Sequence, residues 1–184
     1  MNKFGFLKSH IIKPIKIVLV GYMASGKSSL GTELAETLNI DFVDLDQTIE
    51  ASEKMSISEL FATKGEIYFR KKEGIVLDEV FQRESFVLST GGGTPCYGKN
   101  MEKILLNSTH SFYLRLSIQN LVERIKREKA DRPLVRDIPD EELEEFIRKH
   151  LFERSFFYTQ AKKTIDCNNK SVAAIVADIQ KMLV

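Results

Sequence analysis

Apolar residues along this chain form short continuous runs separated by longer stretches of helical periodicity. The runs are rich in β-branched and aromatic residues, and they predict five strands at residues 16–20, 41–44, 85–89, 110–114 and 163–166. Between them, apolar residues recur every three or four positions, as on one face of a helix. Strands that alternate with helices predict an α/β protein whose parallel sheet is flanked by helices.

Polar residues of the capping type mark where several helices should begin. Ser56 and Glu59 have the spacing of a capping box, and Gly65 is suited to end the helix that they open. Ser117 is placed to cap a later helix. An acidic run at residue 140 begins a long helix that we expect to reach about residue 162, with the charges on a solvated face.

Composition narrows the class of protein. The 184 residues are most simply one domain, 43% hydrophobic and 29% charged, with a net charge of +1. This balance gives no reason to expect a nucleic acid or a membrane as partner. Cys96 and Cys167 lie far apart and outside any metal-binding spacing, so we expect free thiols in a reducing cytoplasm. Lysines interrupt the apolar residues of segment 1–14, which we interpret as a lead-in and not a signal peptide.

A phosphate-binding loop provides the clearest chemistry. Gly21-x-x-x-x-Gly26-Lys27-Ser28 follows a predicted strand and precedes a predicted helix, as this motif requires. Glycines let backbone N–H groups turn toward phosphate oxygens, and the N-terminus of the new helix attracts the same anion. Lys27 is placed to reach the β- and γ-phosphates, and the Ser28 hydroxyl can bind Mg²⁺. An ordinary Gly/Ser turn is the alternative.

Two aspartates follow the second predicted strand. Asp44 and Asp46 are two residues apart, so in a strand they would share one face and project from the carboxyl edge of the sheet. Two carboxylates beside a triphosphate suit the positioning of Mg²⁺ and of an attacking hydroxyl. The alternative is that Asp46 only caps a helix that starts at Gln47.

Two further features accompany the phosphate loop: a run of three glycines and a pair of arginines. Gly91, Gly92 and Gly93 follow the third strand and allow close approach of a ligand, or form a flexible turn. Arg70 and Arg154 lie on apolar helix faces, where they could clamp a carboxylate or form internal salt bridges.

A basic segment without periodicity contains Arg132. Residues 128–138 carry alternating charges and a proline, and we expect a mobile segment without apolar anchors. Such a segment could close over nucleotide phosphates as a lid at about 125–138, or could be only a solvated basic loop.

These motifs, in this order and spacing, resemble those of the shikimate kinase family. The similar segments read VGYMASGKSSLG, FVDLDQTIE, GEIYFRKKE, STGGG, RPL and ERSFFYTQA, and the resemblance runs from Lys16 to the C-terminus. It implies a three-layer P-loop kinase fold with a five-stranded parallel sheet in the order 2-3-1-4-5. The domain would span residues 15–184, after an N-terminal extension of residues 1–14. The activity implied is transfer of the ATP γ-phosphate to the 3-hydroxyl of shikimate, toward chorismate and the aromatic amino acids.

The resemblance also implies a role for each matched residue. Catalysis would use Lys27, Asp46 and Arg132, and one Mg²⁺ per subunit would be held by Ser28 and Asp44. ATP would be bound by Ala24, Ser25, Gly26, Lys27, Ser28, Ser29, Arg127 and Arg132. Shikimate would be bound by Asp46, Arg70, Gly91, Gly92, Gly93 and Arg154. Either Arg127 or Arg124 would stack on adenine, and the spacing leaves this choice open.

The chain departs from the family pattern at a few positions, and rival functions share the fold. Ala24 replaces a usual glycine, which costs about 1 kcal/mol if φ is positive there. The extension 1–14 and the acidic sequence after Arg132 are also unusual. Rivals are a gluconate or nucleoside-monophosphate kinase, a GTP-dependent switch, whose Asn-Lys-x-Asp sequence is absent, and a nucleotide-binding module without catalysis. We expect a monomer.

Overall fold

A five-stranded parallel sheet lies at the centre of the computed structural model, which describes residues 14–132 and 134–183. The strands follow the order β2-β3-β1-β4-β5 and are all parallel, as expected. Their bounds are β1 Lys16–Val20, β2 Asp41–Asp44, β3 Phe86–Ser89, β4 His110–Arg115 and β5 Lys163–Asp166. The predicted extension falls on residues 1–13, outside the described residues, and on Pro14.

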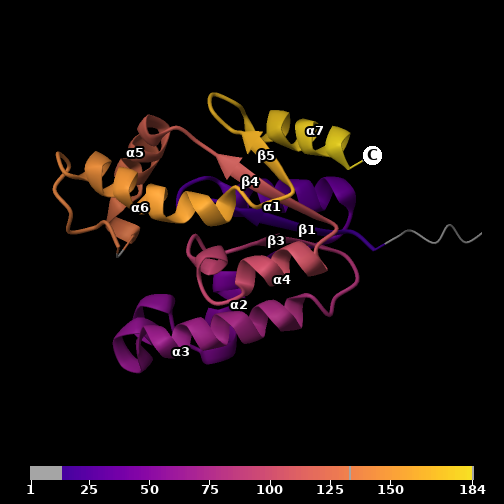
Figure 1. Ribbon diagram of the computed structural model, residues 1–184, viewed down its shortest axis with the longest axis horizontal. Coiled ribbons are helices and arrows are strands. Elements are labelled where there is room, and N and C mark those ends of the chain that lie inside the picture. The colour runs from indigo at the N-terminus through magenta and orange to yellow at the C-terminus, as the bar shows by residue number, and fades with distance from the viewer. Residues whose placement is uncertain (1–13, 133, 184) are drawn as a thin grey trace, which may run out of the picture.

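Helices cover both faces of this sheet (Figure 1). In the view of Figure 1, α7 lies above the sheet, and α3 and α4 lie below it. The α-helices are α1 Lys27–Leu38, α2 Leu45–Glu53, α3 Ile57–Val80, α4 Asn100–Asn107, α5 Ile118–Arg127, α6 Leu143–Tyr158 and α7 Val172–Met182. Two short 3₁₀ helices, η1 Thr94–Cys96 and η2 Lys129–Asp131, complete the order.

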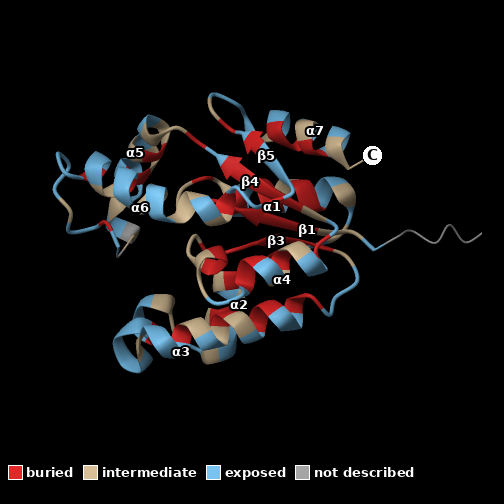
Figure 2. Ribbon diagram, viewed as in Figure 1, coloured by how far each residue is buried: buried red, intermediate tan, exposed pale blue. Residues whose placement is uncertain are grey.

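The apolar core is formed by the sheet and by the helix faces turned toward it (Figure 2). All four residues of β3 and the last four of β1 are buried, which explains their continuous apolar runs. Within the described residues, no helix is long and apolar enough to cross a membrane.

The capping signals predicted from the sequence are present. The Ser56 side chain accepts a hydrogen bond from the Glu59 N–H, and the Glu59 carboxylate accepts one from the Ser56 N–H. Gly65 has φ 79° and ψ 169°, so it breaks helical geometry, and a helix resumes directly after it. Ser117 caps α5. The late helix is shorter than predicted, because the acidic run from residue 140 forms a turn before α6 begins at Leu143.

The segment proposed as a lid has an apolar anchor, contrary to expectation. Val135 is fully buried in the core cluster, and Ile138 packs against it. Lys129 also forms an ion pair with Asp140 at 2.5 Å across the segment. The sequence did not predict this anchor, because Val135 is a single apolar residue among charged ones and so has no periodicity to detect. Residue 133, within the predicted lid, lies outside the described residues.

Candidate active site

The three loops singled out from the sequence follow three adjacent strands. The phosphate loop follows β1, the aspartates follow β2 and the glycines follow β3, and these strands are neighbours in the order β2-β3-β1. Because the strands are parallel, all three loops lie at the carboxyl edge of the sheet. This edge is where open α/β sheets bind their ligands.

In the phosphate loop, the lysine side chain is hydrogen-bonded to the backbone of the loop itself. Gly26, with φ 88°, precedes α1, so the first N–H groups of that helix lie beside the loop. Lys27 is 8% exposed, and its Nζ donates hydrogen bonds to the carbonyl oxygens of Gly21 and Tyr22 at 3.0 Å each. The same Nζ lies 3.4 Å from the Oγ of Ser25. The loop therefore already holds the Lys27 ammonium group in place, and a bound phosphate could replace these oxygens as its partner.

Ala24 stands where the family pattern usually has a glycine, and it adopts a backbone conformation that favours glycine. Its φ is 59°, in the left-handed region, which costs an alanine about 1 kcal/mol. Its carbonyl oxygen accepts a hydrogen bond from Nη1 of Arg124 at 3.3 Å. Arg124 is thus fixed over the loop, whereas Arg127 is exposed at the rim of the same cavity.

The aspartate pair spans the junction of β2 and α2, so the prediction that both lie on one strand is wrong. Strand β2 ends at Asp44 and α2 begins at Leu45 without an intervening loop. Asp44, and not Asp46, caps this helix, by accepting a hydrogen bond from the Gln47 N–H at 3.2 Å. The other Asp44 oxygen accepts a hydrogen bond from Ser28 Oγ at 2.7 Å. Asp46 lies in the first helical turn and is free of the capping role.

Each glycine of the triplet makes room for a different part of the site. A Cβ on Gly91 would lie 2.7 Å from Oδ1 of Asp46. A Cβ on Gly92 would lie 3.3 Å from a backbone nitrogen of the phosphate loop, and one on Gly93 would lie 3.1 Å from the Arg70 guanidinium. The triplet is therefore a tightly packed backbone surface, which argues against a merely flexible turn.

Arg70 is held by a buried carboxylate that sequence reasoning missed. Its Nη1 donates to both oxygens of Glu73 at 3.1 and 3.3 Å, and Glu73 is 0% exposed. Glu73 also accepts a hydrogen bond from Thr94 Oγ1 at 2.7 Å, and the guanidinium lies 3.6 Å from the Tyr97 ring centre. The alternative of an internal salt bridge thus holds for Arg70. The pair orients the guanidinium toward the glycines and leaves it half-buried at the cavity.

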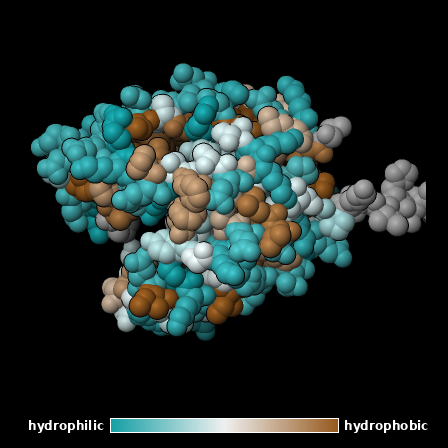
Figure 3. Space-filling model, viewed as in Figure 1, coloured by the Kyte–Doolittle hydropathy of each residue, from teal (hydrophilic) through white to brown (hydrophobic). Residues whose placement is uncertain are grey.

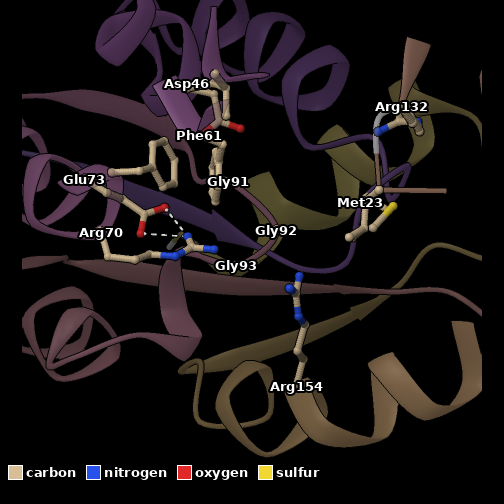
Figure 4. Close-up of a pocket in the computed structure, with 13 residues that line it drawn as sticks. Met23, Asp46, Phe61, Arg70, Glu73, Gly91, Gly92, Gly93, Arg132 and Arg154 are labelled. Atoms are coloured by element: carbon tan, nitrogen blue, oxygen red, sulfur yellow. Dashed lines mark hydrogen bonds and ion pairs between the residues drawn. The ribbon is translucent and has the colours of Figure 1, made fainter. Parts of the chain in front are cut away.

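Arg154 reaches the same cavity from α6 (Figure 4). Among the described residues it forms no ion pair. Its Nη1 would lie 3.8 Å from a Cβ on Gly92, so the guanidinium faces the glycine triplet. One turn later, the hydroxyl of Tyr158 donates a hydrogen bond to the Gly92 carbonyl oxygen. Arg154 is therefore a cation close to an open cavity and without a neutralising partner in the described chain.

Two adjoining cavities collect these residues. The larger, of about 560 Å³, is lined by Ala24, Gly26, Lys27, Ser28, Ser29, Asp44, Arg124, Arg127 and Arg132. The smaller, of about 280 Å³, is lined by Arg70, Gly93 and Arg154 together with Phe61 and Glu73. Asp46, Gly91, Gly92, Met23 and Arg132 line both. Of the predicted residues, only Ser25 lines neither cavity, because its side chain is buried within the loop.

The surroundings of Asp46 and Lys27 shift the pKa of each side chain in the direction that favours its neutral form. Burial raises the pKa of Asp46 from 3.8 to about 6, and the nearby carboxylates of Asp44 and Glu73 add to this. Burial lowers the pKa of Lys27 to about 8, despite the opposing effect of Asp46. Such values suit a carboxylate that exchanges a proton near neutral pH.

Arg132 lies at the rim shared by the two cavities. It forms an ion pair with Glu128, one helical turn earlier in the chain. Its Nε is buried without a hydrogen-bond partner among the described residues. Arg132 is therefore positioned to meet an anion at the junction.

This arrangement on this sheet defines a P-loop kinase of small molecules. A sequence model described as shikimate kinase matches residues 23–184. A shikimate kinase from Flavobacterium psychrophilum is 46% identical over 169 residues, covering 91% of this chain and 98% of its own length.

Solved structures agree with the sequence comparison. A shikimate kinase from Bacteroides thetaiotaomicron has a TM-score of 0.85 at 35% identity, covering 92% of this chain and 98% of its own. One from Acinetobacter baumannii, in complex with shikimate, has a TM-score of 0.84 at 31% identity, covering 93% and 94%. The chain therefore belongs to the shikimate kinase family.

Several residues that complete the site were not predicted. They are Met23, Phe61, Glu73, Thr94, Tyr97 and Tyr158. Glu73 had a detectable signal, because it follows Arg70 by three residues on one helix and such pairs interact. The others depend on contacts between segments distant in sequence, for which the chain carries no local pattern.

Proposed function

We propose that this protein transfers the γ-phosphate of ATP to the 3-hydroxyl of shikimate, giving shikimate 3-phosphate and ADP. One observation carries the proposal: a small cavity that holds two guanidinium groups and an aspartate adjoins the phosphate loop. Shikimate is a small carboxylic acid with several hydroxyls, and the relative from Acinetobacter baumannii binds it. A nucleotide in the larger cavity would place its terminal phosphate toward the shared residues.

The acceptor would be held by charge at one end and by Asp46 at the other. Arg70 and Arg154 would bind the carboxylate, since planar guanidinium groups match its two oxygens. The backbone at Gly91–Gly93 would form the floor, because a Cβ at any of these positions would lie within 3.3 Å of a neighbouring atom. Asp46, across the same cavity, would accept hydrogen bonds from the hydroxyls and orient the attacking one.

The transfer step needs positioning and charge neutralisation. The hydroxyl oxygen attacks the γ-phosphorus, the bond to the β–γ bridging oxygen breaks, and ADP leaves with that electron pair. The hydroxyl proton passes to Asp46 and then to solvent. Lys27 and Arg132 would stabilise the negative charge on the transferring group, and closure of segment 125–138 would exclude water.

Mg²⁺ fits the oxygen atoms beside the loop. Ser28 Oγ and Asp44 are already in contact, and Ser89 Oγ lies 3.3 Å from Ser28 Oγ. Within the described chain no cluster of three or more His, Cys, Asp or Glu side chains could hold a metal alone. Ser28, with Asp44 acting through water, would therefore hold one ion together with ATP phosphates, as Mg²⁺ prefers. The ion would neutralise phosphate charge.

A coupled assay of ADP release tests the acceptor directly. Shikimate, gluconate and AMP would be compared at equal concentrations with ATP and Mg²⁺. We expect turnover with shikimate alone. Turnover with gluconate in place of shikimate would favour the rival kinase, and ATP binding without turnover on any acceptor would favour a module without catalysis.

Replacing the two arginines separates their roles, because only Arg70 has a buried partner. Arg154→Ala should weaken use of shikimate by about 1.5–3 kcal/mol and leave unfolding nearly unchanged. Arg70→Ala should weaken shikimate similarly and also destabilise the fold by about 3 kcal/mol, because Glu73 loses its cation. Shikimate KM, nucleotide affinity and urea unfolding measure this. Damage confined to nucleotide affinity would overturn the assignment.

We also propose that the protein acts as a cytoplasmic monomer, with Arg124 or Arg127 against adenine. Figure 3 shows apolar side chains in small separate groups on the face turned to the viewer, which supports the monomer. Cys96 and Cys167 are free, in keeping with a reducing compartment. Sedimentation with and without ATP and shikimate tests the oligomeric state.

A further inference from the structure

Helix α6 is attached to the active site by one hydrogen bond on each side of Arg154. His150, Arg154 and Tyr158 are spaced by four residues, so they lie along one face of the helix. Tyr158 donates its hydrogen bond to the glycine triplet. On the other side, Nδ1 of His150 lies 2.8 Å from the hydroxyl of Tyr22 in the phosphate loop.

The contact between Tyr22 and His150 is shielded and well packed. Tyr22 is 1% exposed, and its ring meets the His150 ring edge-on, with centres 5.5 Å apart. The Phe146 ring also packs against the imidazole, with the two ring centres 5.3 Å apart. Burial and the nearby Arg154 lower the pKa of His150 to about 4, so the ring is neutral near pH 7 and its Nδ1 can accept a hydrogen bond from the Tyr22 hydroxyl.

Within the described chain, Arg154 lacks the kind of charged partner that holds Arg70. It forms no ion pair among the described residues, whereas Arg70 is held by Glu73 and by the Tyr97 ring. Its position therefore depends on where α6 lies relative to the two loops. The Tyr22 carbonyl also accepts from Lys27, so one residue contacts both the lysine of the phosphate loop and the helix that carries Arg154.

We propose that the Tyr22–His150 hydrogen bond positions Arg154, and so aligns the carboxylate end of the acceptor with the phosphate loop. This inference rests on the proposed function, since it names what Arg154 binds. Tyr22 and His150 are positioning residues that do not touch the reacting atoms. Loss of the bond should let α6 shift and should weaken acceptor binding more than nucleotide binding.

The test compares shikimate and ATP affinities in variants that remove the bond from either side. Tyr22→Phe and His150→Leu should each raise shikimate Kd and KM about three- to tenfold, the range for one neutral hydrogen bond. The KM for ATP should change less than twofold. The double variant should be no worse than either single variant, because both remove the same interaction.

Dependence on Arg154 distinguishes positioning from general stabilisation. In an Arg154→Met background, Tyr22→Phe should cause no further loss of shikimate affinity. Tyr113→Phe is the matched control: this tyrosine ring is also buried, but its hydroxyl makes no hydrogen bond to a described residue. The control should keep the shikimate affinity of the wild type.

Three outcomes would overturn the inference. They are unchanged shikimate affinity in Tyr22→Phe even if its thermal midpoint falls, additive losses in the double variant, and a further loss in the Arg154→Met background. Failure of the proposed function would look different, because the wild-type protein itself would neither bind nor phosphorylate shikimate.

Discussion

Two side chains at the centre of the site have pKa values moved in opposite directions by the same burial. Asp46 and Lys27 both line the larger cavity, and the residues packed around them reduce their access to water. A carboxylate that ionises only near pH 6 and an ammonium that loses its proton near pH 8 define a narrow working range. The chemistry of the site is therefore set by burial as much as by residue type.

The first prediction at this scale is a bell-shaped pH profile. The rate constant kcat/KM for shikimate should fall below about pH 6, because Asp46 must be ionised to accept a proton. It should fall again above about pH 8, because Lys27 must be protonated to bind phosphate. Initial rates between pH 5 and 9.5 measure both limbs. A constant rate across this range would contradict the assignment of both groups.

Asp46→Asn should inactivate the protein while stabilising it. Turnover should fall roughly 10²-fold or more, because the proton acceptor is lost. The raised pKa means that the folded state binds the Asp46 proton more tightly than the unfolded state does. The ionised group thus destabilises the fold above pH 6, and this cost disappears as the pH falls toward 4.

Urea unfolding of Asp46→Asn checks the sign. The variant should be more stable than wild type by about 1–2 kcal/mol at pH 8, and equal to it near pH 4. Asp41→Asn is the control, because this aspartate, at the start of the preceding strand β2, is 75% exposed. Near-normal turnover would leave Asp46 without a catalytic role.

At the scale of elements, the active site depends on how strand ends meet helix starts. The aspartates sit where β2 passes directly into α2, and the glycine triplet sits between β3 and η1. These short junctions fix backbone positions better than long loops could. The glycines then make room for two charged side chains, Asp46 beside Gly91 and Arg70 beside Gly93.

Alanine at adjacent glycines should therefore impair different kinetic constants. Gly91→Ala should lower kcat about tenfold or more, because its Cβ would displace the Asp46 carboxylate. Gly93→Ala should mainly raise the shikimate KM, because its Cβ would press on Arg70. In Gly74→Ala the nearest atom is 3.6 Å away, so this helix control should keep activity and gain stability. The same effect at both positions would refute the division.

Elements were more predictable than the contacts between them. Each strand was predicted to within one residue, because a buried strand carries a continuous apolar run. The strand order came from the family resemblance, because periodicity does not show which strands are neighbours in the sheet. The start of α2 was placed too late, with Asp46 as its possible cap, because a strand that continues directly into a helix has no turn signal. Glu73 was missed because its burial depends on η1, which packs over it from 21 residues away.

At the scale of the whole molecule, one segment connects the two cavities. Arg132 lines both, and the segment around it is anchored in the core by Val135, while the Lys129–Asp140 ion pair runs across the segment. A lid that is anchored at one point can close by rotating about it, which costs less conformational entropy than closing a free loop. Val135 thus becomes the residue on which closure should depend.

The last prediction tests this dependence by amide exchange. In the wild type, the segment at about 125–138 should exchange more slowly with an ATP analogue and shikimate than without them, because Arg132 gains an anionic partner. Val135→Ala should speed exchange of this segment about tenfold without ligands, because the anchor loses buried contacts. The strands should be unaffected. Arg136→Ala, at an exposed position in the same segment, is the control. Equal protection with and without ligands, together with full activity of Arg132→Ala, would reduce the segment to a solvated loop and place closure elsewhere in the chain.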